Sequence, residues 1–347
     1  MKKLSLAAGA AFLASTAMVQ AGGIDRSGQS VDIIFEEGTY AELSFGFVSP
    51  SVSGTDPFGT PTGDLAPSYT LLSGGYKTDF GDKFALALIV DQPFGAGAAY
   101  PGAGSVYDGI TAVVNSAAYT MVGSYNVSDR IVVFGGAVAQ SMSANAELGA
   151  YTIVADQGFG FGYVAGAAFQ IPEYALRVSL TYRSPIAMQL DTLEFGAVTD
   201  VINFSTPQSV NLEFQTGINP KTLIFGSVRW VDWTEFSLSP ANYPLNPLLS
   251  YDNDVITYSL GVGRRLSDTL SAAVTLGYEA SLGGAPSVLA PTDGYFSLGA
   301  GVTYSLGAAK ITGGVRYVWI GDAADPGVGT FAGNNALAVG LKISYSM

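Results

Sequence analysis

Hydrophobic and polar residues alternate with a period of two along most of this chain, most clearly at its C-terminus. In residues 333–347 the larger apolar side chains share one parity, namely Leu337, Val339, Leu341, Ile343, Tyr345 and Met347. Small or polar side chains share the other parity, namely Ala338, Gly340, Lys342, Ser344 and Ser346. This period places the two sets on opposite faces of a β-strand. Such a last strand is typical of a β-barrel whose outer wall contacts lipid.

The alternation recurs upstream and predicts an all-β protein, a transmembrane antiparallel β-barrel of about 14 strands. The strand candidates are 39–49, 67–79, 83–92, 110–127, 130–146, 157–170, 174–188, 207–218, 221–236, 254–266, 269–281, 294–306, 309–321 and 333–347.

The predicted connections alternate between short and long. Short turns are expected at 80–82, 127–129, 171–173, 219–220, 267–268 and 307–308. Longer connections are expected at 50–66, 93–109, 189–206, 237–253, 282–293 and 322–332, with a shorter one near 147–156. In outer-membrane barrels the short turns face the periplasm and the long loops face outward.

The same parity points most charged side chains of the strands into the lumen. A charge on the lipid face near the midplane would cost about 2–4 kcal/mol, so inward parity supports the predicted register. The inward set is Arg177, Arg183, Glu213, Arg265, Glu279, Arg316 and Lys342. Arg229 is expected to join them, although Trp230-Val231-Asp232-Trp233 allows a bulge there.

The N-terminus has the pattern of a secretion signal. Lys2 and Lys3 precede an apolar run, and Val19-Gln20-Ala21 fits a cleavage site before Gly22. We therefore expect a signal peptide over 1–21, a short N-terminal plug segment in the lumen over 22–38, and the barrel over 39–347. Cleavage would remove two of the 15 basic residues and leave 13 against 28 acidic residues.

Composition excludes several classes of function. The acidic balance argues against nucleic acid as a partner. The chain contains no His and no Cys, which removes His-dependent hydrolytic mechanisms and the commonest metal ligands. We expect no enzymatic activity, no cofactor and no metal.

A Pro- and Gly-rich segment, residues 91–104, ends the third predicted strand. Pro93 cannot donate to a strand ladder, and Gly95 and Gly97 weaken pairing. One interpretation is the start of a Gly-rich loop. The other is a kinked strand that leaves a gap in the wall, through which an apolar solute could move sideways into the bilayer.

Four stretches, 66–97, 174–190, 207–236 and 292–306, carry a resemblance to a known family. They include Pro93-Phe94-Gly95 near the third strand, Tyr182-Arg183-Ser184-Pro185 at the end of a later strand, and the pair Trp230 and Trp233. In this order they resemble the FadL/TodX-type outer-membrane transporters (OMPP1/FadL/TodX) of long-chain fatty acids and other hydrophobic compounds. The resemblance implies a fourteen-stranded barrel with lateral diffusion through a kinked third strand.

The chain departs from the family pattern at both ends. Only 22–38 precede the barrel, and the Asn-Pro-Ala of the family's longer plug is absent. The last residue is Met347 rather than Phe, although Tyr345 keeps an aromatic side chain near the end. The family's gating by a shifting N-terminal segment is therefore in doubt for this chain.

Two sets of residues are candidate ligand contacts. Arg183, Arg229 and Arg316 could bind a carboxylate in the lumen, or could pair with Glu213, Glu279 or Asp232. Apolar loop residues could form a capture surface, or could pack together and close the outer mouth. This second set is Phe58, Phe94, Tyr100, Tyr107, Tyr243, Leu245, Leu248, Leu249 and Val288.

The hypothesis that these observations favour is a monomeric, passive channel in the bacterial outer membrane. Its partners would be fatty acids or other hydrophobic small molecules, together with membrane lipid and lipopolysaccharide. The alternative is a general diffusion porin for small polar solutes. The sequence does not decide whether the substrate is aliphatic or aromatic.

Overall fold

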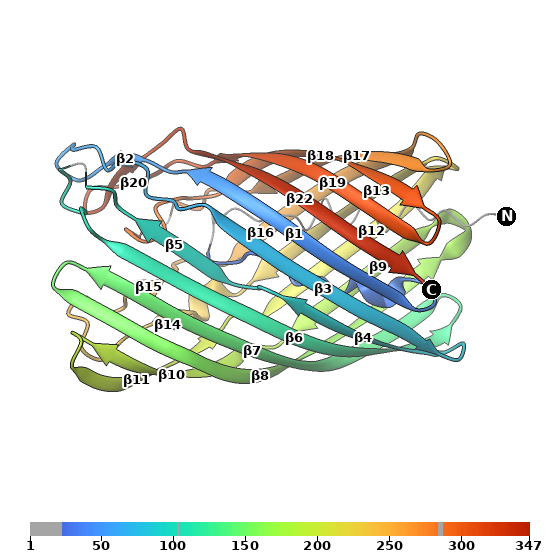
Figure 1. Ribbon diagram of the computed structural model, residues 1–347, viewed down its shortest axis with the longest axis horizontal. Coiled ribbons are helices and arrows are strands. Elements are labelled where there is room, and N and C mark those ends of the chain that lie inside the picture. The colour runs from blue at the N-terminus through green and yellow to red at the C-terminus, as the bar shows by residue number, and fades with distance from the viewer. Residues whose placement is uncertain (1–22, 103, 284–286) are drawn as a thin grey trace.

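A computed structural model describes residues 23–102, 104–283 and 287–347. The predicted signal peptide, residues 1–21, lies outside this part of the chain. The described residues form an antiparallel sheet that closes on itself, as Figure 1 shows. Closure is made by β1 (Tyr40–Ser51) and β22 (Asn335–Ser346), which pair from Tyr40 opposite Ser346 to Ser51 opposite Asn335. The predicted barrel is therefore confirmed.

Neighbours along the chain are neighbours around the wall. After β1 come β3 (Tyr69–Phe80), β4 (Phe84–Asp91), β5 (Gly95–Ala99), β6 (Thr111–Ser128), β7 (Ile131–Leu148), β8 (Tyr151–Ile171), β9 (Leu176–Arg183), β10 (Ile186–Glu194), β11 (Val198–Thr206), β12 (Ser209–Asn219), β13 (Thr222–Val231), β16 (Val255–Arg265), β17 (Leu270–Glu279), β18 (Tyr295–Leu306), β19 (Ala309–Ile320) and β22. Three positions around the wall are each shared by two consecutive strands: β4 with β5, β9 with β10, and β11 with β12. The described wall thus has 14 positions, as predicted.

Side chains alternate between the two faces of the wall. On β22, Leu341 and Ile343 are 45% and 48% exposed on the outside, whereas Lys342 between them is buried. On β18, Phe296 and Leu298 face outward in the same way, and Ser297 is buried. The outer wall is therefore apolar along its strands, which is the surface that a lipid bilayer requires.

The two ends of the barrel differ. The C-terminus and the short turns lie at one end, and the longer connections lie at the other (Figure 1). The longer connections carry β2 (Gly54–Thr55), β14 (Ser237–Leu238), β15 (Leu249–Ser250), β20 (Ala323–Asp325) and β21 (Gly329–Phe331). We call these the short-turn end and the outer end. Helical structure in the described chain comprises η1 (Asp32–Phe35), η2 (Pro172–Tyr174) and η3 (Trp233–Glu235). No helix in the described ranges is long and apolar enough to cross a membrane.

The predicted long connection at 189–206 is wrong. β10 and β11 form a hairpin there, from Ile186 opposite Thr206 to Glu194 opposite Val198. The buried face of this hairpin is mostly apolar but includes Glu194, and the other face carries polar residues such as Gln189 and Asp191. Polar outward residues occur on strand segments beyond the apolar band as well as in loops, so composition alone did not separate the two.

Two other predicted boundaries also move. The connection near 147–156 is a turn at Gly149 and Ala150, because β7 and β8 extend further toward the outer end. The candidate 221–236 ends as a strand at Val231, where the chain turns into η3 and carries Trp233 into the interior.

Glycines let β10 pass close against the inner face of β8. A methyl group on Gly158 would lie 2.2 Å from the carbonyl oxygen of Gln189. A methyl group on Gly160 would lie 2.5 Å from the carbonyl oxygen of Ala187. The outward neighbour Phe159 shows that both glycines face inward. A side chain at either glycine would force the two backbones apart.

Candidate functional site: an interrupted wall and an occupied lumen

The third position of the wall is interrupted where Pro93 lies. β4 pairs with β3 from Phe80–Phe84 up to Gly74–Val90, and β5 pairs only with β6. The N–H of Leu72 on β3 therefore has no strand partner on this side. It donates instead to the side-chain oxygen of Gln92, over 2.9 Å. Sheet pairing thus stops beside the first half of β3.

A cavity lies at this interruption, and residues from both faces of the wall line it. Its lining includes Phe45 and Leu72, which are 48% and 56% exposed on the lipid-facing side. It also includes Arg26 and Asp91 from the interior. We call this cavity the wall opening. Its lining thus combines residues whose side chains face the lipid with residues of the interior.

The chain before β1, residues 23–39, runs inside the barrel and binds the interruption directly. The N–H of Arg26 donates to the carbonyl oxygen of Pro93 over 2.8 Å. The N–H of Gly95 donates to the carbonyl oxygen of Ile24, also over 2.8 Å. These bonds flank a β-bridge between Asp25 and Phe94. We call residues 23–39 the N-terminal segment. It supplies backbone partners at the place where β3 does not.

Arg229 holds this segment from the opposite wall. Its Nε donates to Oδ2 of Asp25 over 2.7 Å, and its Nη1 donates to Oδ1 of Asn211 over 2.7 Å and to Ser209. Arg229 is 5% exposed, so the predicted inward orientation is confirmed. Its carboxylate partner is Asp25, and none of the three predicted acids takes that place.

The other predicted arginines also face the interior. Arg183 donates from Nε to the carbonyl oxygen of Gln29 over 3.1 Å and from Nη1 to Thr120 over 3.3 Å. Arg316 is buried and lines the large cavity described next, together with Tyr295. Arg183 and Arg229 therefore meet the N-terminal segment, a partner that strand parity could not reveal.

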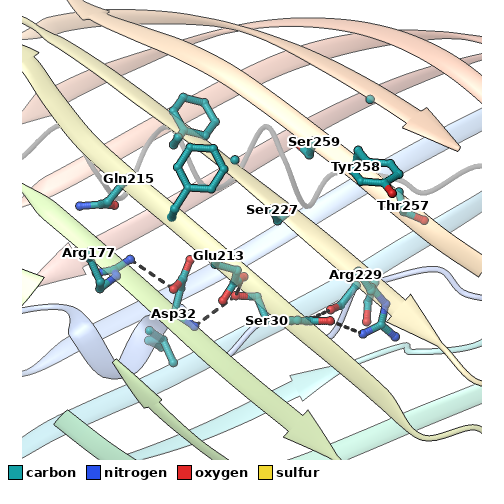
Figure 2. A pocket seen from close by; sticks show the side chains of 18 of the residues that line it. Ser30, Asp32, Arg177, Glu213, Gln215, Ser227, Arg229, Thr257, Tyr258 and Ser259 are labelled. Atoms are coloured by element: carbon teal, nitrogen blue, oxygen red, sulfur yellow. Dashed lines mark hydrogen bonds and ion pairs between the residues drawn. The ribbon is translucent and has the colours of Figure 1, made fainter. Parts of the chain in front are cut away.

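A large cavity lies between the N-terminal segment and the wall formed by β12, β13 and β16, and most of the residues that line it are polar or charged. Figure 2 shows the ion pair of Arg177 with Asp32 and the hydrogen bond from Ser30 to Glu213, over 3.2 Å and 2.9 Å. Hydroxyl groups from the strands complete this side, including Ser227, Thr257 and Ser259. Charged and hydroxyl-bearing side chains therefore line this part of the lumen.

Aromatic side chains fill the outer half of the lumen. Trp233 is completely buried, and its ring centroid lies 5.9 Å from Phe94, 5.4 Å from Phe236 and 5.0 Å from Tyr251. These rings belong to a larger apolar cluster that includes Ile24 of the N-terminal segment. In the sequence, Trp233 stands out as part of the family-like pair with Trp230 and at the end of the stretch that allows a bulge. Its place just after β13 was the available sign that it enters the lumen.

The predicted apolar loop residues divide into two groups. Phe94 and Tyr100 are 3% and 4% exposed, and the Tyr100 hydroxyl donates to the carbonyl oxygen of Val288 over 2.7 Å. Leu248 packs against the buried cluster around Tyr151. These three side chains pack against other apolar residues, each in a different cluster. Phe58 and Leu245, by contrast, are 81% and 74% exposed.

Comparisons with solved structures reproduce this architecture. The crystal structure of a Pseudomonas aeruginosa FadL homologue matches with a TM-score of 0.77 at 13% identity, over 99% of this chain and 98% of that one. The Ralstonia pickettii toluene transporter TbuX matches with a TM-score of 0.69 at 13% identity, over 96% and 97%. The Pseudomonas putida toluene transporter TodX matches with a TM-score of 0.68 at 11% identity, over 96% of each chain.

No protein-family model and no curated protein sequence matches the chain. The fold is that of the FadL and TodX-type barrels over almost its full length. At 11–13% identity this likeness establishes the fold, while the substrate has to be argued from the residues of this chain.

Proposed function

We propose that this protein is a channel of the bacterial outer membrane for passive uptake of hydrophobic compounds, with release sideways through the wall opening. The observation that carries the proposal is the cavity at the interruption of β4 and β5, which is lined from both faces of the wall. The solved structures of the same fold include toluene transporters. Nothing in the proposal requires an energy source.

The polarity of the lumen favours a sideways exit. An apolar solute in the outer half lies among aromatic side chains such as Trp233 and Phe236. To continue to the short-turn end it would have to pass the charges of Arg177, Asp32 and Glu213. Displacing water and partners from such groups is costly. A path through the wall opening also passes charged side chains, among them Arg26 and Asp91, but it ends at Phe45 and Leu72 on the lipid-facing side.

The N-terminal segment acts in this proposal as a short plug. It fills the lumen beside the opening and is bonded to β13 through Arg229 and to the interruption through Pro93. We further propose that residues 1–21 are the export signal, that lipid and lipopolysaccharide surround the barrel, and that the channel is a monomer.

The polar cavity supports a second candidate, a diffusion porin for small polar solutes. Its lining of hydroxyl and charged groups would suit hydrated solutes. Single-channel recording in planar bilayers separates the candidates. A large and steady conductance would favour the porin, and near-silence would favour the hydrophobic channel.

The wall opening is tested by making the interruption a regular strand. The variant Pro93→Val/Gly95→Val/Gly97→Val should lower uptake of both labelled oleate and labelled oleyl alcohol in cells without other uptake routes for them. Gly313→Val is the matched control, because nothing lies within 4 Å of a methyl group built there. Heat-dependent gel migration checks that each barrel is folded. Unchanged uptake in the triple variant would remove the sideways exit.

A further inference from the structure

The connection between β13 and β16, residues 232–254, is folded and is fastened to the wall at its base. The carboxylate of Asp254 accepts hydrogen bonds from Nε1 of Trp230 over 3.1 Å and from the hydroxyl of Thr234 over 2.9 Å. Further along, β14 and β15 pair with each other, so residues 237–250 form a hairpin. The connection is therefore a structured unit rather than an extended loop.

The inner side of this connection is apolar and buried in the lumen. Leu238 and Leu249 are 7% and 5% exposed. Together with Trp233 and Phe236 they belong to the apolar cluster that fills the outer half of the lumen. These side chains occupy the space that a solute in the outer half of the lumen would need.

The tip of the connection contacts strands well away from its base. The ring centroid of Tyr243 lies 4.8 Å from that of Tyr151 on β8. Leu248 packs against the buried cluster that β6, β7 and β8 form around Tyr151. Asn242 donates from Nδ2 to Oε1 of Glu194 on β10, over 3.2 Å. The connection thus extends from β13, past β11 and β10, to β8.

The acceptor at the tip, Glu194, is a buried carboxylate held by neutral donors. Glu194 is 0% exposed, and its Oε2 accepts a hydrogen bond from the Tyr151 hydroxyl over 2.7 Å. No ion pair among the described residues includes it. Burial of a carboxylate without a cation is costly, and hydrogen bonds offset that cost only in part. Opening this contact would return the charge to water, which compensates for some of the apolar packing that is lost.

We propose that residues 232–254 are a lid over the outer mouth of the barrel, and that Glu194, Tyr151 and Asn242 form its latch. When the latch opens, the lid turns about its base at Asp254 and its apolar inner side leaves the lumen. A hydrophobic solute can then enter the space that Leu238 and its neighbours filled. The role of the lid in entry rests on the proposed uptake function, whereas the opening itself does not.

Opening is measured on the purified protein in micelles, without any transport. The chain contains no Cys, so Leu249→Cys introduces a single thiol, on the inner side of the lid. A water-soluble methanethiosulfonate modifies this thiol only when the lid opens. Asn242→Ala removes a donor to the carboxylate and should raise the modification rate about tenfold. Glu194→Gln keeps a side chain of the same shape without the buried charge and should lower the rate. Leu245→Cys, at a lid position that is 74% exposed, is the matched control and should react equally fast in every background.

The role of the lid in entry is tested by fastening it to β8. A bifunctional methanethiosulfonate that bridges Tyr151→Cys/Tyr243→Cys should abolish uptake of labelled oleyl alcohol, and dithiothreitol should restore it. The matched control is Ser237→Cys/Ser250→Cys, because these positions lie opposite each other on β14 and β15 within the lid. The same bridge at that pair should leave uptake unchanged.

Each part of the proposal has its own contradicting result. Modification of Leu249→Cys that Asn242→Ala does not accelerate, or that Glu194→Gln does not slow, would overturn the latch. Uptake that persists with the lid bridged to β8 would overturn its role in entry. If the unaltered protein does not move oleyl alcohol, the proposed uptake function itself fails, while the modification rates still decide whether the latch exists.

Discussion

Asp25 and Arg229 lie 204 residues apart in the sequence and form an ion pair of 2.7 Å inside the barrel. Their side chains are 9% and 5% exposed. The pair joins the segment that precedes the barrel to a strand on the far side of the lumen. It therefore fixes the position of the N-terminal segment beside the interrupted wall.

Removing one member of this pair should release the N-terminal segment. Asp25→Leu or Arg229→Met leaves a buried charge without its partner, which costs about 3–5 kcal/mol. The double variant should lose less stability of the N-terminal segment than the two single variants together, because no unpaired buried charge remains. The rate of native-state proteolysis within the N-terminal segment measures this loss of stability. Strictly additive effects of the two substitutions would contradict a direct coupling.

Lys77 anchors the other end of the segment. Its side chain is 2% exposed. Its Nζ donates to the carbonyl oxygens of Glu36 and Gly38, over 2.7 and 3.0 Å, and to the carboxylate of Asp79. Lys77→Met should leave these carbonyl groups without a donor and loosen the chain there, with the barrel intact. A glutamate-specific protease should then cut after Glu36 or Glu37 several-fold faster. Lys221→Met, at an exposed turn, should leave the cleavage rate unchanged.

Asp56 joins two outer connections and should make their contact depend on pH. Its carboxylate accepts hydrogen bonds from the N–H groups of Phe58 and Thr60, both at 2.9 Å, and from Val106 and Ser105, both at 3.1 Å. Burial acts to raise the pKa of Asp56, but the hydrogen bonds from Thr60, Val106, Phe58 and Ser105 outweigh it and lower the pKa.

The sign of that shift determines the pH range. A lowered pKa in the folded state stabilises the contact above the ordinary Asp pKa of about 4, and the stabilisation is lost as the pH falls through the lower folded value. The chain has no Cys, so Phe58→Cys/Val106→Cys allows spin labels at these two exposed positions. The label distance should increase in acid. In an added Asp56→Asn background it should no longer respond to pH, and a wild-type-like response there would contradict the assignment.

The glycines of β8 should be intolerant of side chains. Gly160→Val would place atoms against the carbonyl oxygen of Ala187 and the side chain of Ile186, so β10 could not keep its position. We expect a lower yield of folded barrel or a clear loss of thermal stability, checked by heat-dependent gel migration. Gly313→Val, on the open face of β19, should behave like the wild type. A fully stable Gly160→Val variant would show that β10 can shift without cost.

The strand positions and orientations were predictable because they depend on local alternation. The parity of Arg183, Arg316 and Lys342 in the sequence matches their burial in the lumen. Pro93 likewise predicted weaker strand pairing, because a residue without an N–H cannot donate to a ladder, but it left a Gly-rich loop and a kinked strand both open. The hairpin of β10 and β11 was missed, because polar outward side chains such as Gln189 and Asp191 look the same on a strand above the bilayer as in a loop.

Alternation along the chain determined that this protein is a barrel and which side chains face inward, because these properties depend on near neighbours in the sequence. Tertiary structure alone decided that Asp25 pairs with Arg229, that Trp233 packs against Phe94, and that Arg26 lines the wall opening. These contacts form only when the closed wall brings the N-terminal segment across the lumen to strands far along the chain, and no local pattern encodes that path.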